Sequence, residues 1–301
     1  MNRPERINIV EVGPRDGLQN EAQRLLPSER IELIGRLADA GLTQIEAGAF
    51  VSPRWVPQMA GSDEVLLALS SRSDLRLPVL VPNRKGYQAA QVAGAREIAV
   101  FGAASETFSK RNINCSIDES IDRFSEICIL ALDEGMTIRG YISCVLGCPY
   151  EGEVDPGRVA ELAARMTAMG CTDISLGDTI GVGTPDKARS LVKACAHGIG
   201  IERLSVHFHD TYGQALANIL ACIEIGVTTV DTAVGGLGGC PYATGSAGNV
   251  ATEDVIYLLD GLGIESGVSL ERLIDITESL CERLGHPPAS RVARARLARR
   301  H

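Results

Sequence analysis

The chain has 301 residues, of which 45% are hydrophobic and 22% charged, and this is the composition of an ordinary globular protein. Its formal net charge of −9 excludes a nucleic-acid-binding protein that relies on a broad basic face. No run approaches the roughly 18 consecutive apolar residues of a membrane span, so we expect neither nucleic acid nor membrane as a partner.

The N-terminus and the cysteines predict a cytoplasmic protein. MNRPER leads into a strand-like run and not into the long apolar segment of a signal peptide. The nine cysteines are scattered along the chain, which favours reduced thiols over a disulfide framework. Cys144 and Cys148 have the wrong spacing for a zinc knuckle, and we expect them to be packing or loop cysteines.

Short apolar runs rich in β-branched residues alternate with longer amphipathic segments. The predicted strands, in chain order, are 7–13, 43–50, 75–82, 97–103, 137–145, 172–178, 203–210 and 228–236. The clearest helix patterns are 28–41, 116–135 and 155–170. For the first of them, Ser28 is the predicted N-cap and Gly41 the stop signal.

Strict alternation of strands and helices predicts parallel strands joined by crossovers. Eight such units favour a (β/α)8 TIM barrel, with a glycine-rich active-site loop after strand eight. An open doubly wound sheet is the alternative, but no GxGxxG follows the first strand. We expect a single catalytic domain over 1–301, in which 291–301, with its five arginines, is a solvated basic tail.

Polar residues gather where the predicted strands end, which is the catalytic end of a TIM barrel. Arg15 and Asp16 follow the first strand, and Glu46 lies within the second. Asn83 follows the third strand, and Asp178 ends the sixth. Charged residues at one mouth of an aliphatic barrel indicate chemistry and not stability.

His207 and His209 form an H-x-H pair on the seventh predicted strand. Residues i and i+2 of a strand point to the same face, so both imidazoles can reach one point. With the carboxylate of Asp16 and an amide oxygen such as that of Asn249, they predict a divalent metal site. These ligands suit Mg²⁺ or Mn²⁺, and the ligands alone leave Zn²⁺ open.

The run 235–249 contains six glycines, as expected for a mobile lid over a site. Cys240 lies near its middle, where a thiol can act as an acid, a base or a nucleophile. Glu253 and Asp254 begin the following helix and are predicted to complement its dipole.

Five segments together resemble the 3-hydroxy-3-methylglutaryl-CoA (HMG-CoA) lyase family of metal-dependent TIM-barrel lyases. They are residues 11–21, 50–59, 174–185, 207–218 and 235–254. The resemblance implies cleavage of HMG-CoA to acetyl-CoA and acetoacetate, as in leucine catabolism, with Mg²⁺ or Mn²⁺ as the metal. It implies the metal ligands Asp16, His207, His209 and Asn249, the catalytic residues Arg15, Glu46, His207 and Cys240, and substrate contacts by Arg15, Gln19, Asn83 and Asp178.

One position departs from the family pattern, because Ala49 stands where a hydroxyl residue is expected before Phe50. A lyase for a longer 3-hydroxy-3-alkylglutaryl-CoA therefore stays open. A related synthase or aldolase, or a non-enzymatic metal-binding barrel, is less favoured. We expect a homodimer, and we expect the phosphates of the acyl-CoA substrate to meet Lys110-Arg111 or Arg84-Lys85.

Overall fold

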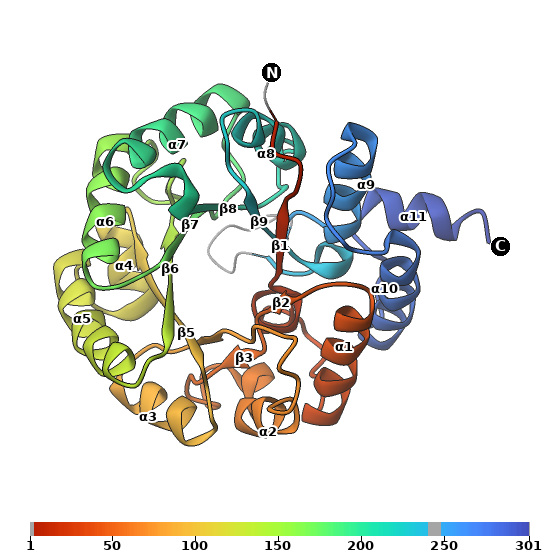
Figure 1. Ribbon diagram of the computed structural model, residues 1–301, viewed down its shortest axis with the longest axis horizontal. Coiled ribbons are helices and arrows are strands. Elements are labelled where there is room, and N and C mark those ends of the chain that lie inside the picture. Colours follow the sequence, from red (N-terminus) through yellow and green to blue (C-terminus); the bar gives the residue numbers. More distant parts are fainter. Residues whose placement is uncertain (1–2, 240–247, 301) are drawn as a thin grey trace.

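The computed structural model describes residues 3–239 and 248–300, in which a ring of helices surrounds a barrel of parallel strands (Figure 1). The strands of this described part are β1 (Asn8–Glu11), β2 (Gln44–Ile45), β3 (Gly48–Ala49), β4 (Val79–Leu80), β5 (Glu97–Ala103), β6 (Thr137–Ser143), β7 (Asp173–Asp178), β8 (Leu204–Phe208) and β9 (Thr229–Thr232). The predicted TIM barrel is confirmed.

The predicted second strand, 43–50, is split into β2 and β3, and this split closes the barrel. β2 pairs with β1, whereas β3 pairs with β4. At the break, the Glu46 N–H donates to the Glu11 carbonyl at 2.9 Å, and the Ala47 N–H donates to the Pro78 carbonyl at 3.0 Å. One segment thus joins the first and last strands of the ladder β2-β1-β9-β8-β7-β6-β5-β4-β3.

The helices of the described residues cover the outside of the barrel. They are α1 (Pro27–Asp39), α2 (Ser62–Ala68), α3 (Arg84–Val92), α4 (Glu106–Ile113), α5 (Ile117–Asp133), α6 (Pro156–Ala168), α7 (Pro185–Ile199), α8 (Ala215–Ile223), α9 (Thr252–Leu262), α10 (Leu270–Leu284) and α11 (Arg291–Leu297). Ser116 and Asp155 cap α5 and α6 by accepting backbone N–H bonds.

The N-cap predicted for α1 was wrong by two residues. The helix begins at Pro27, so Leu26 is the N-cap residue. The reason is that proline suits the first helical position, where its missing N–H costs nothing. The Glu29 carboxylate accepts the Leu26 N–H at 2.6 Å. Gly41, with a φ of +109°, lies just past the end of the helix, as the stop signal predicted.

The C-terminal segment was predicted to be a solvated tail, and this was wrong for Arg291–Leu297, which form α11. Its arginines face outward, but Ala293 is fully buried. The Asp254 carboxylate accepts hydrogen bonds from Ser290 Oγ and from the Arg291 and Val292 N–H groups, and so caps α11. The capping role predicted for Asp254 therefore extends to a different helix from the one it begins.

Within the described ranges, no helix has both the length and the apolarity required to cross a membrane. The eight cysteines of those ranges are all free and buried.

Candidate metal centre and active site

A π-helical turn, η1 (Gly13–Gly17), carries Arg15 and Asp16 to the mouth of the barrel directly after β1. Glu11 holds the turn in place, because its Oε1 accepts the N–H groups of Gly13 at 2.8 Å and of Val234 at 2.9 Å. A Cβ on Gly13 would lie 2.5 Å from that same oxygen. The sequence GPRDG therefore permits a tightly packed turn, in which the side chains of Arg15 and Asp16 both face one pocket.

Arg15 joins two carboxylates. Its Nε donates to Glu46 Oε2 and its Nη1 to Asp16 Oδ1, each at 2.7 Å. Among the described residues Nη2 has no hydrogen-bond partner, so one arm of the guanidinium is available to a ligand. Burial raises the pKa of Glu46 above its usual range, and Arg15 offsets only part of this effect.

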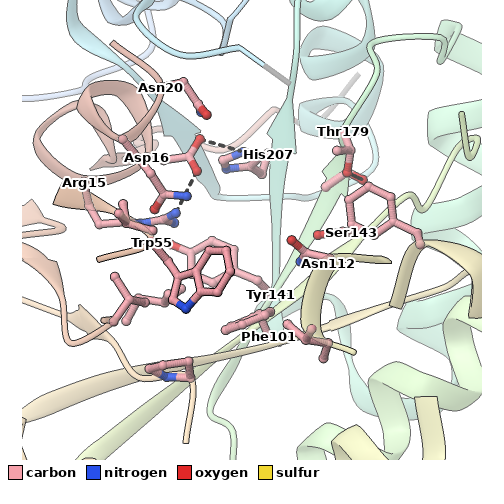
Figure 2. Close-up of a pocket in the computed structure, with 18 of the residues that line it drawn as sticks. Arg15, Asp16, Asn20, Trp55, Phe101, Asn112, Tyr141, Ser143, Thr179 and His207 are labelled. Atoms are coloured by element: carbon pink, nitrogen blue, oxygen red, sulfur yellow. Dashed lines mark hydrogen bonds and ion pairs between the residues drawn. The ribbon is translucent and has the colours of Figure 1, made fainter. Parts of the chain in front are cut away.

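Asp16, His207 and His209 come together as a three-residue group whose ligand-type atoms all lie within 4.8 Å of one another. The histidines come from the end of β8 and Asp16 comes from η1, so the fold joins segments that are nearly two hundred residues apart. His207 Nε2 lies 3.8 Å from Asp16 Oδ2, and a dashed line marks this contact in Figure 2. The Asn249 amide donates to the same Asp16 oxygen at 2.8 Å, so Asn249 Oδ1 is the atom left to bind a metal.

The residues present fit a divalent cation. His209 Nδ1 is buried and has no hydrogen-bond partner among the described residues, and burying such an atom is costly unless a ligand engages it. Burial and the neighbouring His207 lower the pKa of His209 to about 4, so His209 is neutral near pH 7, as a metal ligand must be. Burial would raise the pKa of Asp16, but Arg15 with both histidines brings it below its usual range, so Asp16 is a carboxylate.

A pocket of about 430 Å³ opens in front of this group. Figure 2 shows Arg15, Asp16 and His207 on one side of the pocket and Ser143, Asn112 and Thr179 on the opposite side. Apolar side chains complete the lining, namely Val51, Trp55, Val56, Leu80, Phe101, Phe108, Ile113 and Ile142. The pocket thus offers charge at one end and apolar walls along its length, as suits a charged head group on a longer chain.

The other predicted site residues divide into two groups. Gln19 and Asn83 line the pocket, and Asn83 also caps α3 by accepting the Gly86 N–H at 3.0 Å. Cys240 lies outside the described residues. Asp178 is not among the residues that line the pocket, and its predicted substrate contact stays a prediction. Its carboxylate accepts the backbone N–H groups of Val182 and Gly183, and burial raises its pKa to about 6.

Ala49 also lies outside this pocket, so the missing hydroxyl does not change its walls. Its N–H donates to Ser62 Oγ, and the residue lines a neighbouring cavity between α2 and α3. The basic pairs Arg84-Lys85 and Lys110-Arg111 are exposed on α3 and α4. The guanidinium of Arg111 lies 4.3 Å from the centre of the Tyr150 ring. Neither pair is among the residues that line the pocket of the metal group.

Sequence reasoning missed several pocket residues. Tyr141 lies at the centre of the pocket in Figure 2, and its ring centre is 5.6 Å from the Arg15 guanidinium. Ser143 ends β6 and Thr179 follows β7, so their place at strand ends was an available signal. Trp55 is 87% exposed beside the pocket, and as the one tryptophan of the chain it could have been singled out.

Comparison with known proteins agrees with this geometry. The model of the HMGL-like family matches residues 6–280. The chain belongs to the HMGL-like family. The mitochondrial hydroxymethylglutaryl-CoA lyase of Bos taurus is 53% identical over 292 residues, which cover 97% of this chain and 90% of that protein. The resemblance stated from the sequence motifs is confirmed.

Three comparisons with bacterial proteins add detail. A Pseudomonas aeruginosa protein named 3-hydroxy-3-isohexenylglutaryl-CoA/hydroxy-methylglutaryl-CoA lyase is 54% identical, covering 99% of this chain and all of its own. A crystal structure of hydroxymethylglutaryl-CoA lyase from P. aeruginosa has a TM-score of 0.97 at 54% identity, with coverage of 99% and 100%. An Acinetobacter baumannii HMG-CoA lyase in complex with coenzyme A and 3-methylmalate has a TM-score of 0.92 at 35% identity, covering 97% of this chain and 95% of its own.

Proposed function

We propose that the protein is a carbon–carbon lyase that cleaves HMG-CoA to acetyl-CoA and acetoacetate. The observation that carries this proposal is the Asp16, His207 and His209 group beside the Arg15 guanidinium at one end of the pocket. The names of the relatives support the same substrate.

The reaction is a retro-Claisen cleavage. The C3 hydroxyl loses its proton, the C2–C3 bond breaks, and C3 becomes the ketone carbon of acetoacetate. The bonding electrons pass to the thioester, and the resulting enolate takes a proton at C2 to become acetyl-CoA. When bound, a divalent metal supplies Lewis acidity and chelation at oxygen, for which we propose Asp16, His207, His209 and Asn249 as ligands and Mg²⁺ or Mn²⁺ as the ion.

Arg15 is the proposed stabiliser of the enolate oxygen. Glu46 and Asp16 hold its Nε and Nη1, so the guanidinium is oriented before substrate arrives. A preorganised donor of this kind acts where charge develops in the transition state. Glu46 lies beneath Arg15 and outside the pocket lining, so its proposed role is to orient Arg15.

Asp16, which lines the pocket next to His207, is the proposed acceptor of the C3 hydroxyl proton, because both nitrogens of a metal-bound His207 are engaged. The resemblance to the family assigns the proton delivered to C2 to Cys240. We propose that removing this thiol lowers kcat by about 10²–10⁴-fold, the usual contribution of general acid–base catalysis.

A direct assay tests the activity. Purified protein is incubated with HMG-CoA and Mg²⁺ or Mn²⁺, and acetoacetate is measured before and after EDTA and after metal is restored. We expect cleavage that EDTA abolishes and added metal recovers. Cleavage that is indifferent to EDTA, or no cleavage with either metal, would reject the proposal.

A longer 3-hydroxy-3-alkylglutaryl-CoA is a second candidate substrate. The apolar wall of the pocket, which includes Leu80, Phe101 and Ile142, can bury an alkyl substituent, and the name of one 54% identical relative includes such a substrate. The ratio of kcat/KM for the isohexenyl and methyl substrates decides between them. A ratio above one would make the longer acyl chain the preferred substrate.

We also propose a role in leucine catabolism, a cytoplasmic location and a homodimer. The eight cysteines of the described residues are free, which suits a reducing compartment. Two-fold dimers are the commonest assembly for soluble enzymes, and sedimentation of the purified protein measures the assembly directly.

A further inference from the structure

We propose that Asp231 is a positioning residue, which fixes the ring orientation and the tautomer of His207 so that Nε2 is the nitrogen presented to the metal. The inference rests on the proposed metal centre but not on which acyl-CoA is cleaved. It assigns a task to a buried acid that none of the sequence motifs contains.

The register of the barrel places the two residues together. β8 and β9 pair with His207 directly opposite Asp231, so both side chains point into the barrel interior. His207 Nδ1 lies 3.2 Å from Asp231 Oδ2. Asp231 is 1% exposed and His207 8% exposed, so no bulk water competes for this contact.

The remaining contacts of Asp231 decide which partner carries the proton. The Arg139 Nη2 donates to Asp231 Oδ1 at 2.6 Å, and the Ser175 hydroxyl donates to Oδ2 at 2.8 Å. A carboxylate ion-paired to a guanidinium only accepts hydrogen bonds. His207 therefore donates through Nδ1–H, and the lone pair on Nε2 faces Asp16 and the pocket.

Arg139 lies on β6 and also bonds to residues of β6, β7 and β8. Its Nε donates to Asp173 at 2.6 Å, its Nη1 to the Tyr141 hydroxyl at 2.9 Å, and its Nη2 also to the Ser205 hydroxyl at 2.8 Å. The Tyr141 ring meets the His207 ring edge-on, with centroids 6.0 Å apart. Asp231 thus lies in a rigid hydrogen-bonded group and not on a mobile loop.

The two histidines of the pair are consequently not equivalent. His207 is oriented by a carboxylate, the usual device that sets the ligating nitrogen of a metal-bound histidine. The buried Nδ1 of His209 has no such partner among the described residues. Loss of Asp231 should therefore disturb the metal centre through His207.

A purely structural role, neutralising Arg139, is the competing explanation, and Asp173 provides the matched control. Asp173 and Asp231 each pair with Arg139 at 2.6 Å, but only Asp231 contacts His207. Asp231→Asn and Asp173→Asn remove one carboxylate each from the same guanidinium. In Asp231→Asn, Arg139 keeps the amide oxygen, so the amide N–H₂ faces His207 and favours the Nε2–H tautomer.

The first measurement is made on the wild-type protein without metal, and a variant serves only to assign the His207 signals. Two-bond ¹H–¹⁵N correlations of the histidine rings, with His207 assigned through a His207→Gln variant, report the tautomer. We expect His207 as the Nδ1–H form. A wild-type His207 in the Nε2–H form would overturn the proposal.

The second measurement is Mn²⁺ affinity by titration calorimetry. We expect Kd to rise about 10–100-fold in Asp231→Asn, the usual cost of losing such a partner, and to stay within about threefold in Asp173→Asn. An equal change in the two variants would mean a structural role and overturn the proposal. If wild-type protein fails to cleave HMG-CoA while Mn²⁺ binding still separates the variants, the proposed function fails and the positioning role stands.

Discussion

Arg15 is a guanidinium held almost without solvent between two acids. Ion pairs removed from water are costly unless their geometry is good, and both contacts of Arg15 are 2.7 Å long. The benefit of this arrangement is orientation, because a charge fixed before reaction needs no reorganisation when the enolate forms. The residue therefore contributes more to rate than to stability.

Substitution of Arg15 by methionine tests this role. Arg15→Met removes the donor to the enolate oxygen and retains an unbranched side chain, so we expect kcat to fall by about 10²–10³-fold. Steady-state kinetics with HMG-CoA measures the effect. Arg72→Met, which removes a surface arginine paired with Asp74, is the control and should leave kcat unchanged. An Arg15→Met enzyme within threefold of wild type would exclude Arg15 from the mechanism.

Among single residues, the sequence predicted those site residues that lie together in a short motif. Arg15-Asp16 and His207-x-His209 were found because neighbouring polar residues interrupt apolar strands. Asp231 could not be found this way, because it is a single acid within a strand. Its role depends on the pairing of that strand with β8, which the sequence does not show. Asp178 was singled out by its position at a strand end. The sequence did not reveal that the following loop turns the Val182 and Gly183 N–H groups onto its carboxylate.

Among the elements, β1, the η1 turn and α9 are joined by one buried carboxyl group. Glu11 is fully buried, accepts two N–H bonds through Oε1, and meets the Thr252 hydroxyl at 2.6 Å through Oε2. Burial raises the pKa of Glu11 to about 8, since its hydrogen bonds only partly compensate for lost hydration. Near neutral pH the carboxyl is therefore mostly protonated.

This protonation makes stability depend on pH. Below the ordinary pKa of about 4.5, Glu11 is protonated in the folded and unfolded states. As pH rises toward 8, the unfolded chain loses this proton and the folded protein keeps it. The folded state then binds more protons, so its stability falls through this window.

Glu11→Gln should remove the dependence, because an amide mimics the neutral acid at every pH. Relative to wild type, we expect the variant to gain stability between pH 5 and 8, on the order of a few kcal/mol. Urea unfolding at several pH values measures the difference. Glu97→Gln, at an acid paired with Arg76, is the control. A constant difference between Glu11→Gln and wild type across this range would contradict a protonated Glu11.

Element order was predictable from periodicity, but element length was not. β4 has two residues where eight were predicted, because Pro78 and Pro82 lack the N–H that a ladder needs. The second strand divides at Glu46 and Ala47, whose N–H groups bond to neighbouring strands on opposite sides. Such a division depends on barrel curvature, which hydrophobic alternation does not express.

At the scale of the whole molecule, a barrel with aliphatic walls was expected because eight strand–helix units repeat over a chain with few aromatic residues. The closing helix α11 was missed, since its basic sequence lacks a broad apolar face. It is held by its cap from Asp254, by the buried Ala293 and by ion pairs such as that of Arg296 with Glu271 at 3.5 Å. Such contacts join segments that are distant in the sequence, so the sequence pattern alone does not predict them.

The same assembly predicts how metal affects unfolding. Asp16 follows the first strand of the barrel and the two histidines come from β8, so the complete ligand group exists only when the barrel is closed. A cation that binds the folded state alone stabilises it, by about 2.7 kcal/mol when present at 100 times its Kd. We therefore expect Mg²⁺ or Mn²⁺ to raise the thermal midpoint and EDTA to reverse the increase.

Asp16→Asn should remove this metal response, because it takes away the one carboxylate of the group. Asp186→Asn, at a surface acid paired with Arg189, should retain it. Differential scanning calorimetry over a series of metal concentrations measures both variants against wild type. A metal-dependent rise that persists in Asp16→Asn would place the cation elsewhere on the molecule. A rise confined to proteins with Asp16 would tie closure of the barrel to formation of its metal centre.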